Sequence, residues 1–156
     1  MSISAWRIVK RKLANDAFSG RGARVYGGRW NSPGVAMVYA AASQSLAALE
    51  ILVHAEAPEL LGYYVVIEVS IESSLIQVLD PSQLPRDWQA EPPPDALRKI
   101  GDYWIRSASS PVLRVPSAII PAESNFLLNP QHEKFGTLVI GKPQPFRFDP
   151  RLTVRK

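Results

Sequence analysis

The stretch from Gly27 to Val53, GGRWNSPGVAMVYAAASQSLAALEILV, sets the strongest limits on how this chain folds. Its opening glycine pair allows a tight turn or a close backbone approach. The apolar run Val35–Ala40 then predicts a buried strand with Tyr39 near its end. The 14 prolines of the chain add fixed turns throughout its length. Together these features indicate many short elements packed around one core.

A helix is predicted over Leu46–Ala55, capped by Ser43 or Ser45 and ending before Pro58. Its residues 46–53 read LAALEILV, in which Glu50 is the only polar residue. A carboxylate in an apolar run is costly unless it is paired, hydrogen-bonded or protonated. Unless the helix end lifts Glu50 into solvent, its position indicates a functional group.

Helical spacing places this acid among apolar side chains rather than on a polar face. Leu46, Leu49, Glu50 and Val53 follow the i, i+3, i+4, i+7 pattern, so they are predicted to share one face. The same spacing brings His54 near Glu50. A Glu–His pair is conceivable there, although a surface or helix-end histidine is the more common arrangement.

Composition narrows the class of protein. With 156 residues and no cysteine, the chain suits one domain without disulfides or thiolate metal sites. No apolar run reaches the length of a membrane helix and no signal peptide is evident, so a cytoplasmic protein is expected. The net charge of +4 is dispersed apart from Lys10–Lys12. It is compatible with nucleic acid, an acidic partner protein or a phosphate-bearing small molecule.

The remaining pattern predicts a mixture of strands and helices, hence an α+β domain with small mixed or antiparallel sheets flanked by helices. A loop is expected over 14–28, and a proline-rich surface connection over 82–94. A second helix is expected over Asp95–Ser107, and Gly101 within it suggests close packing at that point. Further strands are predicted over Ala5–Val9, Tyr63–Ile71, Leu75–Leu79, Val112–Val115, Ser117–Ile120, Leu138–Ile140 and Phe146–Phe148.

Few polar residues stand in apolar settings: Arg29, Tyr39, Glu50, Ser117 and Asn125. Ser117 lacks the glycine-flanked turn of a hydrolase nucleophile. With only His54 and His132 available, a metal site is not expected. Arg7 lies in the first predicted strand, where an edge position with its head in water and a role in a site are equally plausible.

These residue types suit cleavage of an N-glycosidic bond, a reaction that builds positive charge on a sugar. A carboxylate stabilises that charge, an arginine holds phosphates bidentately, and an aromatic ring stacks against a base. Glu50, Arg29 and Tyr39 provide one of each. Sequence spacing does not show whether they meet, and a structural ion pair between Arg29 and Glu50 is an alternative.

The chain resembles the RES-domain family, toxins of bacterial toxin–antitoxin pairs whose antitoxins are Xre-like. The resemblance covers essentially residues 1–156 as one RES domain. Arg29, Glu50 and Ser117 match the arginine, glutamate and serine that name the family. The matching stretches are GGRWN at 27–31, Tyr39, AALE at 47–50, VPSAIIPAES at 115–124, NFLLNP at 125–130 and FRFDPRL at 146–152.

The resemblance implies a fold related to ADP-ribosyltransferases and a transferase-type activity on NAD. NAD would be the substrate, with no separate cofactor. The nicotinamide–ribose bond would be cleaved by phosphorolysis or hydrolysis, depleting NAD and arresting growth. The implied partners are an Xre-like antitoxin and, for phosphorolysis, inorganic phosphate. The protein would meet DNA only through the antitoxin, and no membrane would be involved.

The resemblance also implies roles for individual residues. Glu50 would stabilise the ribosyl cation or position the nucleophile, and Ser117 would contact substrate or fix Glu50. Arg29 would bind the NAD phosphates, while Tyr39 would pack against nicotinamide or its ribose. Arg7 is a further phosphate contact, Asn125 a polar support and substrate contact, and Trp6 a wall of the pocket.

Two other functions remain open from the sequence. The same fold can transfer ADP-ribose to a specific protein instead of to phosphate or water. A non-catalytic basic module that binds nucleic acid would account for the net charge and for Lys10–Lys12. It would not account for the acid in LAALEILV.

Overall fold

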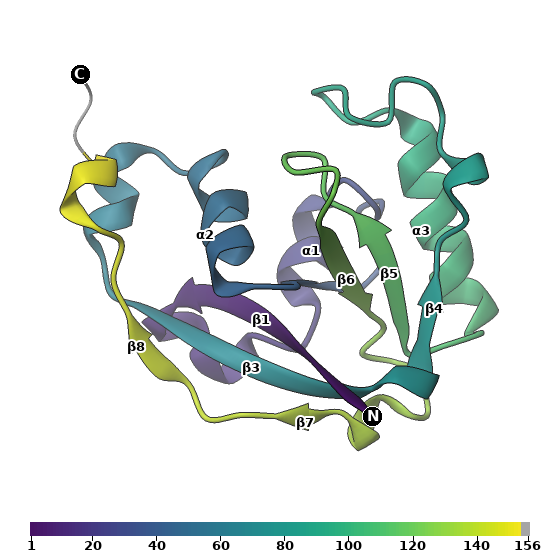
Figure 1. Ribbon diagram of the computed structural model, residues 1–156, viewed down its shortest axis with the longest axis horizontal. Coiled ribbons are helices and arrows are strands. Elements are labelled where there is room, and N and C mark those ends of the chain that lie inside the picture. Colours follow the sequence, from purple (N-terminus) through teal and green to yellow (C-terminus); the bar gives the residue numbers. More distant parts are fainter. Residues whose placement is uncertain (154–156) are drawn as a thin grey trace.

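The computed structural model describes residues 1–153, which build an α+β fold around one curled sheet (Figure 1). Residues 154–156 of the expected domain lie outside this part. The sheet has eight strands, and seven follow the order β4-β5-β6-β2-β1-β3-β7, with β8 also pairing with β3. The strands are β1 Ser2–Lys10, β2 Val38–Ala41, β3 Tyr64–Glu72, β4 Ile76–Val78, β5 Val112–Pro116, β6 Ser124–Leu128, β7 Val139–Ile140 and β8 Gln144–Phe146.

The antiparallel pair of β1 and β3 forms the longest ladder, from Ser2 opposite Glu72 to Lys10 opposite Tyr64. Only β4 and β5 are parallel among the described strand pairs. β1 also pairs with β2, so it lies inside the sheet. Of the two alternatives for Arg7, the edge-strand position is therefore not the observed one.

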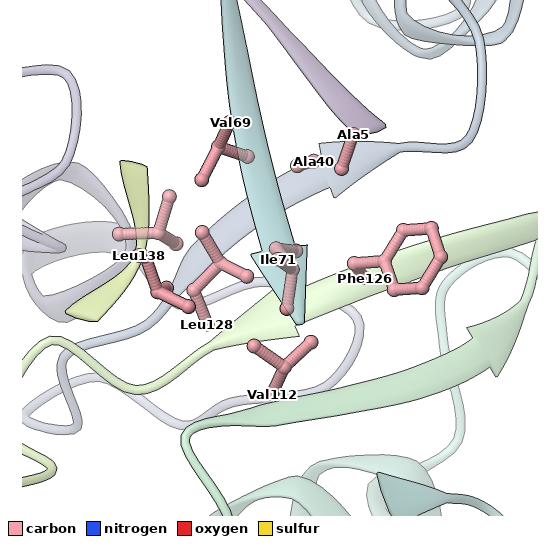
Figure 2. Packing of buried hydrophobic residues seen from close by; sticks show 9 residues of the cluster. Ala5, Ala40, Val69, Ile71, Val112, Phe126, Leu128 and Leu138 are labelled. Atoms are coloured by element: carbon pink, nitrogen blue, oxygen red, sulfur yellow. The ribbon is translucent and has the colours of Figure 1, made fainter. Parts of the chain in front are cut away.

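Strand β3 packs against buried residues on both of its faces. Val69 and Ile71 pack in a core with residues of β1, β2, β5 and β6, and Figure 2 shows these side chains converging. Tyr64 and Val66, on the opposite face, lie in a second cluster with residues of helix α2. The strand is buried on both faces at its start because α2 covers it there.

Helix α2 spans Gln44–Leu52 and begins where the Ser43 side chain accepts a hydrogen bond from the Leu46 backbone N–H. The expectation of a cap at Ser43 or Ser45 is thus confirmed at Ser43. The predicted helix face needs correction at its far end, since Val53 is 55% exposed. Ala47, Ala48 and Ile51 contribute to the buried contacts instead.

Helix α3 spans Asp95–Ser107, as predicted, and covers a third cluster of buried residues. Its Gly101 lies against the backbone of Trp30: a Cβ built there would stand 1.7 Å from the Trp30 carbonyl oxygen. The close packing expected at Gly101 is therefore confirmed. In Figure 1, α2 and α3 stand apart, with the β5–β6 connection between them.

Two expectations about local structure are wrong. Residues 14–28 are not a plain loop, because they contain part of a 3₁₀ helix, Arg11–Asp16, and the short helix α1, Arg21–Tyr26. Ser117–Ile120 is a bend rather than a strand. Its backbone N–H groups at Ile119 and Ile120 both donate to the Ser117 hydroxyl oxygen, which leaves them unavailable to a ladder.

Gly101→Ala is expected to lower the free energy of unfolding by about 1–3 kcal/mol, because the new methyl group overlaps the Trp30 carbonyl. Gly22→Ala in α1 is the matched control, since a Cβ at Gly22 meets nothing within 4 Å. Helix propensity alone makes that control neutral or stabilising by up to about 1 kcal/mol. Urea denaturation measures both; equal stability of the two variants would contradict the packing argument.

Candidate active site

A cavity of about 610 Å³ opens between α2 and α3. Strands β1, β2 and β6 line its floor, and α1 and the connection before α3 contribute to its walls. Five of the sequence-predicted site residues line it: Arg7, Arg29, Tyr39, Glu50 and Asn125. Trp6 and His54 line it as well. The structure therefore brings together residues that are far apart in the sequence.

Glu50 reaches the cavity from α2, at the margin of the buried face of the helix. Its Oε1 accepts a hydrogen bond from Asn125 Nδ2 at 2.7 Å and another from Ser117 Oγ at 3.2 Å. Two neutral donors thus offset the cost of partly burying this carboxylate. Within residues 1–153 no donor contacts Oε2, so this oxygen is available to a ligand.

Ser117 lies behind Glu50 and does not line the cavity. It is 0% exposed, and its hydroxyl oxygen accepts hydrogen bonds from the Ile119 and Ile120 N–H groups while its proton goes to Glu50. These contacts fix the hydroxyl, so its proton points at the carboxylate. The arrangement lets Ser117 orient Glu50 but keeps it from direct contact with a ligand.

Asn125 has a side-chain oxygen with no partner. Its Nδ2 donates to Glu50, while Oδ1 is buried and accepts no hydrogen bond in the described part of the chain. Turning the amide over would set an oxygen against the carboxylate, so the contact with Glu50 fixes the orientation. A buried acceptor without a donor is unfavourable, and this one lies on a residue that lines the cavity.

Tyr39, from β2, holds the turn at residues 27–31 through hydrogen bonds of its hydroxyl. Its hydroxyl donates to Asn31 Oδ1 at 2.6 Å and accepts from the Trp30 N–H at 3.0 Å. Burial raises the pKa of this hydroxyl above its usual value. A Cβ at Gly28 would lie 2.6 Å from the hydroxyl oxygen, so any other residue there would displace the Tyr39 hydroxyl. The close approach expected at the glycine pair is made to Tyr39.

Arg29 follows that turn, and its guanidinium holds the connection before α3. Nη1 donates to the carbonyl oxygens of Trp88 and Ala90, each at 3.1 Å, and Nη2 pairs with Glu91 at 3.0 Å. The ion pair of Arg29 is therefore with Glu91, and the alternative of an Arg29–Glu50 pair is not the observed arrangement.

Arg7 carries a charge without a carboxylate beside it. Its Nε donates to the Ala17 carbonyl at 2.7 Å and Nη1 to the Tyr39 carbonyl at 2.9 Å. Burial lowers the pKa of this guanidinium to about 10, which still leaves it charged at neutral pH. Among the ion pairs of residues 1–153, none involves Arg7. A partly buried cation in this state favours the binding of an anion.

Other expectations concern histidine and metal. His54 lies beyond the end of α2, and no hydrogen bond joins it to Glu50 in the described structure. The same part of the chain contains no group of three His, Cys, Asp or Glu side chains able to hold a metal ion. None of its helices has the length and apolar character needed to cross a membrane.

Three contributors to the site escaped the sequence analysis: Asn31, Glu91 and Arg98. Asn31 is fully buried, and its side chain ties Tyr39 to the Ala23 and Val35 carbonyl oxygens. Its place in GGRWN was the available signal. Glu91 and Arg98 line the cavity from a surface connection and from α3, where charged residues are ordinary.

Comparison with known proteins identifies a family for the chain. The RES domain family model matches residues 4–149. A protein named Toxin Res from Yersinia enterocolitica is 43% identical over 148 residues, which is 94% of this chain and 97% of the relative. A Prs ADP-ribosylating toxin from Sphingobium sp. is 38% identical over 161 residues, which is 100% of this chain and 99% of the relative.

A solved structure shows the same fold. A chain in the crystal structure of the M. tuberculosis MbcT–MbcA toxin–antitoxin complex matches with a TM-score of 0.78 at 21% identity. The match covers 98% of this chain and 87% of that chain. The expected α+β fold is therefore confirmed, and it is shared with that chain.

Tyr39→Phe is expected to lower the free energy of unfolding by about 1–3 kcal/mol, because it leaves Asn31 Oδ1 and the Trp30 N–H without their partner. Thermal or urea denaturation measures the loss. Tyr26→Phe is the control, since Tyr26 is 84% exposed and its hydroxyl has water as a partner. An equally small effect of both substitutions would show that the buried hydroxyl does not hold the turn.

Proposed function

This chain belongs to the RES domain family, and on that premise we propose that it is the toxin of a toxin–antitoxin pair that breaks the nicotinamide–ribose bond of NAD. It acts in the cytoplasm, depletes NAD there and so arrests growth. An Xre-like antitoxin restrains it, and the toxin meets DNA only through that partner. Names of relatives such as Toxin Res support the toxin assignment.

The observation that carries the proposal is the presentation of Glu50. A carboxylate in an apolar helix is held by two neutral donors on Oε1, and its Oε2 is left available in the cavity. In the reaction the glycosidic C–N bond breaks, and its electron pair leaves with nicotinamide. Since the pyridinium ring becomes neutral as it leaves, no general acid is required. Glu50 stabilises the positive charge that develops on the ribose.

Ser117 and Asn125 orient this carboxylate. Ser117 is a positioning residue, because its hydroxyl is fully buried behind Glu50. Asn125 positions Glu50 through its Nδ2, and its place in the cavity lining supports a contact of the residue with substrate.

The other side chains bind the rest of NAD. Arg7 supplies a charge that forms no ion pair with a carboxylate of residues 1–153, which suits a phosphate group. Arg29 binds the same diphosphate once its contact with Glu91 is released. Tyr39, whose hydroxyl is already engaged, offers its ring to nicotinamide or the adjoining ribose.

The nucleophile is phosphate or water in this proposal, and ADP-ribosyl transfer to a protein is the alternative. The name of the Sphingobium relative, an ADP-ribosylating toxin, favours the alternative. Both reactions break the same bond and use Glu50 in the same way. They differ in the acceptor that forms the new bond to the anomeric carbon.

Glu50→Gln is expected to lower kcat for nicotinamide release about 100-fold or more, because the amide cannot stabilise the ribosyl cation. Release is measured with purified protein, with and without phosphate. Glu133→Gln is the control, as it makes the same charge change at an exposed position. Undiminished release by a folded Glu50→Gln protein would contradict the catalytic assignment.

The same assay separates the acceptors when the NAD carries a label in its adenosine. Release that depends on phosphate and yields a phosphorylated ADP-ribose indicates phosphorolysis, while free ADP-ribose indicates hydrolysis. Label retained on a macromolecule would replace both with protein modification. Absence of nicotinamide release under all these conditions would overturn the proposed function.

Asn125→Ala is expected to lower kcat about tenfold or more, because it removes the donor that orients Glu50. Steady-state kinetics of nicotinamide release measures the change, and circular dichroism verifies folding. Asn125→Asp keeps an acceptor but sets a second carboxylate against Glu50, so it is expected to be at least as impaired. Normal kcat for Asn125→Asp would exclude the proposed arrangement.

A further inference from the structure

The end of the cavity that faces α3 holds three charged side chains, Arg29, Arg98 and Glu91. The two arginines are linked through the backbone. Arg98 Nε donates to the Gly28 carbonyl oxygen at 3.1 Å, and this carbonyl belongs to the peptide bond that precedes Arg29. The charges of both arginines act on the Tyr39 hydroxyl. We call Arg29, Arg98 and Glu91 the arginine end of the cavity.

Arg29 has few donors to spare at this end. Both protons of Nη1 go to the Trp88 and Ala90 carbonyl oxygens, and Nη2 gives one proton to Glu91. The two carbonyls hold Arg29 to the backbone of the connection whether or not Glu91 stays in place. Of these three engaged donors, only the one bound to Glu91 is held by a group that can leave, so the position of the Glu91 carboxylate is where a ligand can replace an existing contact.

Arg98 is held in the opposite manner, with its orientation fixed and its terminal nitrogens largely free. The Gly28 carbonyl engages Nε, whereas the ion pair of Nη1 with Asp95 is long, at 4.0 Å. Asp95 is 87% exposed, so water screens that pair strongly. The side chain of Arg98 itself is 35% exposed, in keeping with its place on the cavity wall.

Glu91 is the part of this arrangement that can leave at low cost. Its side chain is 68% exposed, against 20% for Arg29. An ion pair with one partner so exposed contributes little to stability. A diphosphate carries more charge than a carboxylate and has more acceptor oxygens, so it competes well for the same guanidinium.

We propose that Arg98 is a substrate-binding residue, which forms with Arg29 a two-guanidinium anion site, and that Glu91 occupies this site until a phosphate of the substrate displaces it. The inference rests on the proposed function for the identity of the substrate, and it adds Arg98 and Glu91 to the residues that recognise it. The anion site itself is defined by its geometry and can be tested without catalysis.

The direct test is calorimetric titration of inorganic pyrophosphate into the full chain. Arg98→Gln is expected to weaken binding about tenfold or more, since it removes charge-assisted donors. Lys99→Gln is the matched control: it makes the same charge change on the adjacent, exposed residue of α3, outside this cavity. Arg98→Lys keeps the charge but loses the planar fork, so an intermediate affinity is expected.

Glu91→Gln is expected to tighten pyrophosphate binding about two- to fivefold, because the competing carboxylate is removed. Glu133→Gln controls for the change in net charge at an exposed position. In nicotinamide release the same Glu91 variant is expected to lower KM for NAD, and Arg98→Gln is expected to raise it.

Equal pyrophosphate affinities for Arg98→Gln and Lys99→Gln in folded proteins would remove Arg98 from the site. Unchanged or weaker binding by Glu91→Gln would overturn the displacement by phosphate. Absence of pyrophosphate binding by both wild type and Glu91→Gln would reject the anion site altogether. If nicotinamide release fails while these binding differences hold, the proposed function falls and the anion site stands.

Discussion

The backbone of residues 28–32 is held from several sides, and the geometry of the cavity depends on it. The Tyr39 hydroxyl binds the Trp30 N–H and Asn31. Two bonds from Ser32 to the Asp102 carboxylate, at 2.6 and 2.9 Å, tie the turn to α3. Because this segment carries Arg29, the strand that provides Tyr39 and the helix that provides Asp102 together decide where the guanidinium stands.

This tethering explains constraints on residues that never touch a ligand. Gly101 brings α3 against the Trp30 carbonyl, and Gly28 leaves room for the Tyr39 hydroxyl. A methyl group at either position would push the turn away from its partners. The packing of α3 and the position of Arg29 therefore depend on each other, because both require the close contacts that Gly28 and Gly101 allow.

Local patterns predicted the elements whose cause is local. The helix predicted over Asp95–Ser107 has the same first and last residues as α3. The acid in LAALEILV, Glu50, lines the cavity. Helix α1 was not predicted because it is only six residues long and contains a glycine. It is held by distant groups, among them the Asn31 side chain on the Ala23 carbonyl.

Features that depend on contacts between distant segments could not be predicted from the sequence. The partner of Arg29 is Glu91, 62 residues away in the sequence, and no periodicity links the two. Ser117–Ile120 has the apolar character of a strand, but the Ser117 hydroxyl takes up the N–H groups that a ladder needs. In both cases a side chain forms a specific contact, with a carboxylate or with backbone N–H groups, that hydrophobic periodicity does not reveal.

The two arginines predicted to bind phosphate are compensated in different ways, and this difference bears on how the cavity accepts an anion. Arg7 is hydrogen-bonded only to backbone carbonyls, so its charge is not neutralised by any carboxylate in residues 1–153. Arg29 is neutralised by an exposed carboxylate on a connection. An anion entering the cavity therefore gains the full attraction of Arg7, whereas at Arg29 it gains only its advantage over Glu91. In the proposed binding mode, the charge of Arg7 attracts anions in general, and the Arg29–Glu91 pair selects those able to replace a carboxylate.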